Sequence, residues 1–252
     1  YDYLYNIGFN ADLLKQIRTT IKTKDNVESN IDDPNVNYCD FCGRPLDQVD
    51  YDVLIDGRER CPECSRTSVK TLKELKLLYN LTVRNMEIYF GIKIHKGIKL
   101  KMVNAKELNK IAHIKFTPTS GFDARALGIA IKKRKHEYFI YVENSSPRTA
   151  FIATLVHELT HIWQYENWNE KEMRRQYGRK HLEIDEGMAK WVEIQYMILI
   201  GEKGFAKRQE QLTLKRNDEY GKGLKLFIDK YPFSLGSFIE AKTPFNNINT
   251  PL

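Results

Sequence analysis

The sequence VHELTH occupies residues 156–161 and lies inside an apolar, helix-forming run, residues 150–163. On a helix, residues four positions apart share one face, so His157 and His161 can direct ring nitrogens toward one metal ion. Glu158 lies beside them and can serve a metal-bound water. Two surface histidines flanking a glutamate are the alternative, but only 6 of the 252 residues are histidine. The motif therefore predicts a catalytic zinc site.

A catalytic zinc ion commonly has three protein ligands and an open position for water. Downstream of the two histidines, the candidates for the third ligand are His181, Glu183, Asp185, Glu186 and Glu193. We favour Glu186, because it begins a segment predicted as a second helix. Gly187 and Ala189 would allow that helix to approach the first closely. His181 is the main competitor; we expect it before the second helix, as a loop histidine or an outer partner of the site.

The predicted mechanism follows from these parts. Zinc would acidify its bound water and polarise a substrate carbonyl, and Glu158 would move the water proton to the leaving amine. Glu193, two turns beyond Glu186 on the same helix face, can orient a ligand histidine. The developing oxyanion needs a further donor, and Tyr220 in the segment DEYGKG is the candidate. Because the chain has 14 tyrosines, a packing or surface role is the alternative for Tyr220.

All four cysteines of the chain fall in two C-x-x-C pairs, Cys39 with Cys42 and Cys61 with Cys64. Four thiolates at this separation predict a tetrahedral structural zinc, and a D-G turn at residues 56–57 can bring the pairs together. A redox pair would not need a second copy, and two disulfides are the other alternative. Since cysteine fills every position, we expect this site to be closed and without catalysis.

The predicted fold class is α+β, with a small antiparallel sheet beside the metal helix and a helical half from residue 182 onward. By segment, we predict an N-terminal helix and linker over residues 1–36, a four-cysteine zinc module over 37–66 and a zinc metallopeptidase domain over 67–252. Shorter patterns predict a long helix over residues 65–90, a strand over 92–103, a helix over 105–111 and a loop over 117–122.

Immediately before the metal helix, residues 125–131 and 137–144 predict a β-hairpin. The basic run KKRK at residues 132–135 falls between these strands. For this run a solvated turn is favoured over a phosphate-binding patch. Ser146 can cap the metal helix, with Pro147 in the first turn.

Composition bounds the partners and the compartment. The net charge of +7 is spread among 33 acidic residues, so we expect no nucleic-acid partner. No apolar run reaches the roughly 18–20 residues needed to cross a bilayer, and the first residues show no signal-peptide pattern. The zinc module takes every cysteine and leaves none for disulfides, which fits a reducing compartment. We therefore expect a cytoplasmic protein that acts on a protein or peptide substrate.

Together the motifs resemble the LIM-associated, ubiquitin-activated zinc peptidases of plants and their bacterial relatives, within the gluzincin clan. The likeness covers roughly residues 37–246. In chain order it rests on Cys39-x-x-Cys42, Asp56-Gly-Arg-x-x-Cys61-x-x-Cys64, His157-Glu-x-x-His161-x-Trp163, Glu186-Gly, Tyr220-Gly-x-Gly223 and Thr243-Pro-Phe. The resemblance implies a gluzincin-type fold with His157, His161 and Glu186 as zinc ligands. It also implies Glu158 as the catalytic carboxylate and the cysteines as the remnant of a LIM-like zinc finger.

The resemblance has one further implication and one departure. In zinc peptidases of this clan, an edge strand just upstream of the metal helix pairs with the substrate backbone. We therefore expect an extended peptide to bind along Gly128, Ile129 and Ala130. No complete tandem LIM domain and no ubiquitin-interacting helix precedes Cys39, so regulation by ubiquitin is not expected, and the chain is more similar to the bacterial members.

Two other functions remain open at this point. A DNA-associated protease of the SprT-like type also combines H-E-x-x-H with a zinc ribbon. Its third ligand is a histidine, which here would be His181, and its ribbon follows the catalytic helix instead of preceding it. The second is a latent or inactive peptidase fold whose four-cysteine module binds a partner protein. The intact Glu158 argues against an inactive enzyme, because its loss would be the simplest inactivating change.

Overall fold

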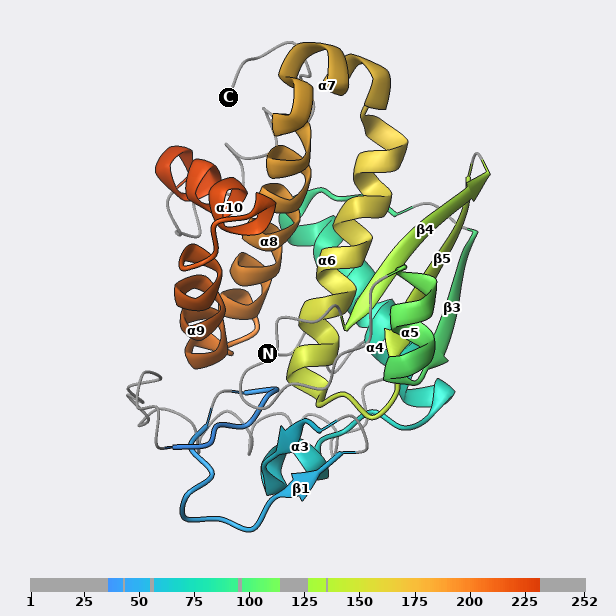
Figure 1. Ribbon diagram of the computed structural model, residues 1–252. Coiled ribbons are helices and arrows are strands. Elements are labelled where there is room, and N and C mark those ends of the chain that lie inside the picture. The colour runs from blue at the N-terminus through green and yellow to red at the C-terminus, as the bar shows by residue number, and fades with distance from the viewer. Residues whose placement is uncertain are drawn as a thin grey trace.

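The computed structural model describes residues 36–42, 44–54, 57–94, 97–113, 127–134 and 136–231. Several predicted features lie outside these residues: the N-terminal helix and linker apart from residue 36, Asp56 of the predicted turn, the loop over 117–122, and the motif that begins at Thr243. The described part is α+β, with a small sheet, a set of helices and a four-cysteine cluster (Figure 1).

The main sheet is mixed, not antiparallel as predicted. Its strand order is β3 (Ile98–Val103), β5 (Glu137–Glu143) and β4 (Gly128–Arg134). The predicted hairpin is present, because β4 pairs antiparallel with β5, but β3 lies parallel to β5. A parallel neighbour needs a crossover connection, and the chain between β3 and β4 includes the short helix α5 (Ala105–Ile111). Within the described residues, β4 is therefore an edge strand.

Two strand boundaries differ from the predicted ones. The strand predicted over residues 92–103 begins only at Ile98. Residues 132–134 of the basic run belong to β4 and not to a turn, and Arg134 pairs with Glu137 across the hairpin; Lys135 lies outside the described residues. Residues 132–134 are exposed, and an exposed strand end can carry charged side chains without a desolvation cost.

The helix α6 (Arg148–Asn167) carries the H-E-x-x-H motif and lies between the sheet and α8 (Figure 1). Pro147 occupies its N-cap position, and no side chain caps it, so the prediction for Ser146 is wrong. In the described part of the chain, the buried Ser146 hydroxyl has no hydrogen-bond partner. The first N–H of the helix instead donates to a neighbouring backbone, from Arg148 to the carbonyl of Thr67 at 3.0 Å.

The helix predicted over residues 65–90 is divided into α3 (Pro62–Arg66), α4 (Leu72–Asn85) and a π-helical turn, η1 (Met86–Phe90). The division follows from a capping box, in which the Thr71 and Glu74 side chains each accept from the other residue's backbone N–H. Because this cap starts a new helix, the segment between α3 and α4 is extended. There Val69 exchanges backbone hydrogen bonds with Ser145 and Ser146, which joins the segment to the start of α6.

The described part of the C-terminal half, up to residue 231, is helical, as predicted. It contains α7 (Glu170–Tyr177), the 3-10 turn η2 (Gly178–Lys180), α8 (His181–Leu199), α9 (Lys203–Leu214) and α10 (Glu219–Lys230). The helix α8 begins at His181, five residues before the predicted start at Glu186, so His181 is helical and not a loop residue. No helix in the described part is both long and apolar enough to span a membrane.

A glycine contact sets the crossing of α8 and α10. A Cβ added to Gly187 would overlap the backbone of Gly223, and one added to Gly223 would overlap the carbonyl of Glu183 and Gly187 itself. The prediction that Gly187 lets α8 approach the metal helix is therefore wrong. The two glycines instead let α10 lie directly against α8, close to Glu186.

The four-cysteine module lies next to the N-terminal end of α6 (Figure 1). It contains the short strands β1 (Asp52–Val53) and β2 (Glu59–Arg60), paired antiparallel, and the helix α3. Its described core consists of Cys39, Phe41, Leu46, Cys61 and Cys64. A buried ion pair joins Arg58 of the module to Glu143 at the end of β5, with side chains 3% and 6% exposed. The module is therefore fixed to the sheet and to the start of α6.

Candidate metal sites and active-site pocket

Three side chains from two helices converge at the centre of the protein. The Nε2 atoms of His157 and His161 lie 3.1 Å apart, and they lie 3.2 and 3.4 Å from Oε2 of Glu186. Of the five candidates for a third ligand, Glu186 alone joins the histidines in a metal-ligand group within the described residues. His181 lies elsewhere: its Nδ1 is 2.6 Å from the carbonyl oxygen of Gly178.

These distances fit a zinc ion. Nitrogen and oxygen ligands at ~2.0–2.1 Å from zinc in a tetrahedron lie about 3.3 Å from one another. The three measured edges, 3.1, 3.2 and 3.4 Å, are close to this value. If both ring nitrogens were unprotonated at 3.1 Å, their lone pairs would repel each other. A proton or a cation between the two nitrogens removes this repulsion. The donor set is therefore compatible with zinc.

Each histidine is held at its other ring nitrogen. Nδ1 of His157 lies 3.2 Å from Oε2 of Glu193, which in turn accepts from Lys190 at 2.7 Å. Nδ1 of His161 donates to Oε1 of Gln164 at 2.8 Å. These contacts leave both Nε2 atoms directed at Glu186. The orienting contact of Glu193 was predicted; Gln164 was missed, although it lies on the His161 face of the same helix, three residues on.

The charges of the group are strongly coupled. Burial would lower the pKa of His157, but Glu186 and Glu193 outweigh it and raise that pKa to about 9. Burial would raise the pKa of Glu186, but the two histidines outweigh it and hold that pKa well below its usual range. The two glutamates therefore stabilise positive charge at His157. A bound metal ion would supply such a charge, and its binding is coupled to the loss of protons from its ligands.

Glu158 is 7% exposed and lies beside the group, under the edge strand. Burial raises its pKa, while the two histidines and a backbone hydrogen bond from Ala130 act in the opposite direction. The approach of β4 depends on Gly128, because a Cβ there would overlap the methyl group of Thr154 and lie 3.4 Å from Cγ of Glu158. Gly128 thus brings the edge strand into contact with the carboxylate.

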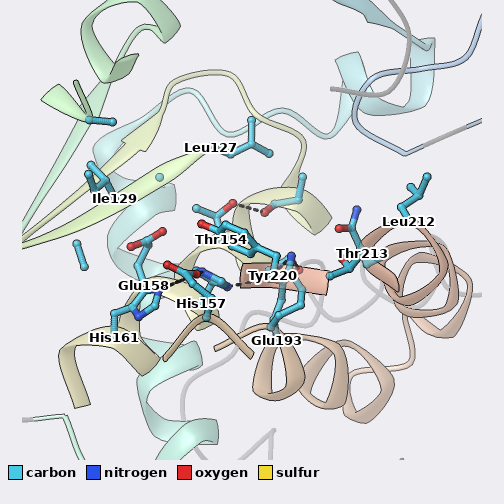
Figure 2. A pocket seen from close by; sticks show the side chains of 18 of the residues that line it. Leu127, Ile129, Thr154, His157, Glu158, His161, Glu193, Leu212, Thr213 and Tyr220 are labelled. Atoms are coloured by element: carbon cyan, nitrogen blue, oxygen red, sulfur yellow. Dashed lines mark hydrogen bonds and ion pairs between the residues drawn. The ribbon is translucent and has the colours of Figure 1, made fainter. Parts of the chain in front are cut away.

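Tyr220 faces the group from the first turn of α10. Its ring lies 6.0 Å from the ring of His157, centroid to centroid, with the planes 19° apart. Burial, together with Glu186 and Glu158, raises the pKa of the Tyr220 hydroxyl, which is hydrogen-bonded to Glu186. Figure 2 shows Tyr220 beside His157, with Glu158 and His161 directed into the same space. The structure therefore brings the predicted oxyanion donor to the metal-ligand group.

A pocket of about 690 Å³ opens onto these residues. Its wall includes Gly128, Ile129 and Ala130, the residues predicted to bind a peptide. It also includes residues that the sequence did not suggest, from the four-cysteine module and from α9: Asp40, Phe41, Phe205, Gln209, Leu212 and Thr213. No local pattern indicates that these residues reach the pocket, because only the tertiary fold brings them there.

The four cysteines form a second, closed cluster. Their Sγ atoms lie within 4.8 Å of one another, and those of Cys42 and Cys61 are 3.8 Å apart. Thiolates at ~2.3 Å from zinc in a tetrahedron lie about 3.8 Å apart. The backbone N–H groups of Cys61 and Cys64 donate to the sulfurs of Cys39 and Cys61, respectively, each at 3.4 Å. All four cysteines are free of disulfides. The cluster is therefore compatible with a zinc ion.

No family model, curated protein or solved structure matches this chain. The function is therefore argued from the geometry of the two clusters and of the pocket.

Proposed function

We propose that this chain is a zinc-dependent endopeptidase of the gluzincin type that hydrolyses peptide bonds in protein substrates. One observation carries the proposal: two histidines and a glutamate have their ligand atoms at zinc spacing, next to a buried glutamate, at the base of an open pocket. The four-cysteine cluster would hold a second, structural zinc ion. The proposal assigns His157, His161 and Glu186 as the catalytic ligands.

The residues around the metal have separate roles in this proposal. Bound zinc supplies Lewis acidity, which lowers the pKa of a water molecule and polarises the substrate carbonyl. Glu158 accepts the proton of the attacking water, and its raised pKa suits the later transfer of that proton to the leaving amine. Tyr220 donates its hydroxyl hydrogen to the developing oxyanion. That donation requires the Tyr220 hydroxyl to exchange its bond to Glu186 for one to the substrate.

The edge strand offers a place for the substrate backbone. The N–H of Glu143 donates to the carbonyl of Leu127, so Leu127 and the alternate residue Ile129 direct their backbone groups toward β5. Gly128 and Ala130 direct theirs toward the pocket, which is consistent with the bond from Ala130 to Glu158. A peptide in the pocket can thus add a strand to the sheet along β4.

The proposal is tested by digesting a peptide library with the zinc-loaded protein and with Glu158→Gln. We expect cleavage to fall by a factor on the order of 10²–10⁴ in this variant, because the proton carrier is lost, with zinc content unchanged. Glu170→Gln, the same substitution at an exposed position on α7, serves as the control. Wild-type protein that holds zinc at both sites and cleaves nothing, or equal cleavage by Glu158→Gln, would contradict the proposal.

The two alternatives have less support. The DNA-associated protease needs a histidine as third ligand, and His181 lies outside the metal-ligand group of the described residues. A scaffold without activity would not require the buried carboxylate Glu158, which is costly to keep in an apolar helix. No specific observation favours either one, and we propose neither.

A further inference from the structure

The four-cysteine module forms one wall of the active-site pocket. Asp40 and Phe41, the two residues between Cys39 and Cys42, line the pocket. Leu127, the residue that leads into β4, lines the same part and packs against the core of the module. A zinc module that served only for stability would not need to contribute to this wall.

The wall is held rigidly. The guanidinium of Arg58 lies 4.8 Å from the centre of the Phe41 ring and forms the buried ion pair with Glu143 of β5. A second arginine, Arg60, donates to the carbonyl of Ser145 at 3.2 Å. The two arginines thus join the module to the end of β5 and to the segment that follows it, so the fold places Asp40 at the pocket.

Asp40 is the acidic residue that the module contributes to this wall. Its side chain belongs to a residue that is only 5% exposed, and Oδ2 accepts from the backbone N–H of Glu59. Within the described residues, Oδ1 is buried and has no hydrogen-bond partner. Leaving such an oxygen unsatisfied is unfavourable, and more so when the group is charged. A ligand that brings a hydrogen-bond donor, above all a positively charged one, would remove this cost.

The strand β4 connects this oxygen to the catalytic residues. Ala130 is bonded to Glu158, and Leu127, three residues earlier, contacts the module. Three residues of strand span about 10 Å. A peptide paired antiparallel with β4, the slightly more stable arrangement, runs from Ala130 toward Leu127 in its own N-to-C direction. Its residues on the leaving-amine side of the scissile bond therefore approach the module.

We propose that the four-cysteine module is a specificity subsite, in which Asp40 receives a lysine or arginine side chain of the substrate. The side chain belongs to the second or third residue on the leaving-amine side of the scissile bond. Phe41 and Leu127 enclose its apolar stem. This inference rests on the proposed peptidase function and deepens it, because the structural zinc site then also shapes substrate choice.

The test uses short peptides with an N-terminal hydroxamate, which binds catalytic zinc and directs the peptide to the leaving-amine side. One series carries lysine at the second or third position, and a matched series carries norleucine, which has the same stem without the charge. Dissociation constants are measured by calorimetry on the zinc-loaded full chain. We expect the lysine peptide to bind about tenfold more tightly at one of these positions, as for a charge-assisted hydrogen bond.

Two variants separate the subsite from the stability of the module. Asp40→Asn keeps the shape of the side chain and should abolish the preference for lysine while both zinc ions are retained. Asp47→Asn alters an exposed residue of the same module that does not line the pocket, and it should keep the preference. The comparison of lysine with norleucine on the wild-type protein stands even where Asp40→Asn loses zinc.

The outcomes distinguish the two proposals. Hydroxamates that bind with equal affinity whether they carry lysine or norleucine overturn the subsite and leave the peptidase function intact. A lysine preference that persists in a zinc-replete Asp40→Asn protein also overturns the subsite. Hydroxamates that do not bind the zinc-loaded protein at all overturn the peptidase function, and the subsite with it.

Discussion

The two clusters of ligand side chains differ in what holds them in place. The four cysteines lie in a module whose described core has five residues, three of them cysteines. The His157, His161 and Glu186 group lies on two long helices inside the large hydrophobic core of the protein. We therefore expect the module to need a metal ion for its fold, and we expect the two helices to hold their side chains in place without one.

The clusters also differ in the number of donors and in access. Four thiolates complete a tetrahedron and leave no position for a substrate. Two imidazoles and a carboxylate would leave one position open on a bound zinc ion, and all three side chains belong to residues that line the pocket. In the proposed function, one metal ion stabilises the module and the other takes part in catalysis.

The largest effect is expected from Cys61→Ser, which removes a fully buried ligand of the module. Structural zinc sites contribute ~10–16 kcal/mol of apparent binding free energy that is coupled to folding. We expect residues 36–66 to lose protection from hydrogen exchange, measured by mass spectrometry, while α6 stays protected. His157→Ala is the matched variant at the other cluster and should leave protection of the module unchanged. Full protection of the module in Cys61→Ser would remove the distinction between the clusters.

The next effect concerns the glycine crossing behind the catalytic group. Gly223→Ala adds a Cβ that would overlap Glu183 and Gly187, so α10 must move away from α8. Overpacking of this kind costs about 1–3 kcal/mol, measured by urea denaturation. Because α10 carries Tyr220, turnover should fall while zinc content stays the same. Unchanged turnover in a folded Gly223→Ala protein would argue against Tyr220 as an oxyanion donor.

A smaller effect is expected from Glu193→Gln, which weakens the contact that orients His157. Loss of such an outer partner lowers metal affinity by about 10–100-fold. Competition with a chromogenic chelator measures this affinity, and the zinc of the four-cysteine site should be unaffected. An unaltered zinc affinity would mean that the packing around α6 orients His157 and that the Glu193 carboxylate is not needed for this.

The smallest effect has the opposite sign. A Cβ added to Gly204 on α9 has only Arg208 Nη1 nearby, at 3.7 Å. Gly204→Ala should therefore stabilise the protein by about 0.5–1 kcal/mol, since alanine loses less backbone entropy on forming a helix. Stability is again measured by urea denaturation. Destabilisation by Gly204→Ala would show that the space around the added Cβ does not by itself decide the effect at the two glycines.

Local patterns explain what the sequence could predict. The spacing of His157 and His161 on one helix face, and of the cysteines in two pairs, needs only a few neighbouring residues, so both groups could be recognised in advance. The helix over residues 105–111 has the predicted bounds for the same reason. Glu186 was favoured from the sequence, and the structure places it with the histidines.

Features that depend on tertiary packing could not be predicted. The parallel pairing of β3 with β5 could not be predicted, because no local sequence pattern indicates which strands are neighbours in the sheet. The contact of Gly187 with Gly223 depends on how α10 packs against α8. The sequence had suggested that Gly187 would face the metal helix instead. The position of Asp40 in the pocket wall depends on ion pairs between distant segments, such as Arg58 with Glu143. These long-range contacts carry no signature at short sequence separation.

The most direct test of the account is the zinc content per chain, by elemental analysis, of protein purified without added metal. We predict about two zinc ions for the wild type and for His181→Ala, and about one for Glu186→Ala, in which the four-cysteine site alone stays filled. One zinc ion in all three proteins would contradict the catalytic metal site, and loss of zinc in His181→Ala but not in Glu186→Ala would contradict its ligand assignment.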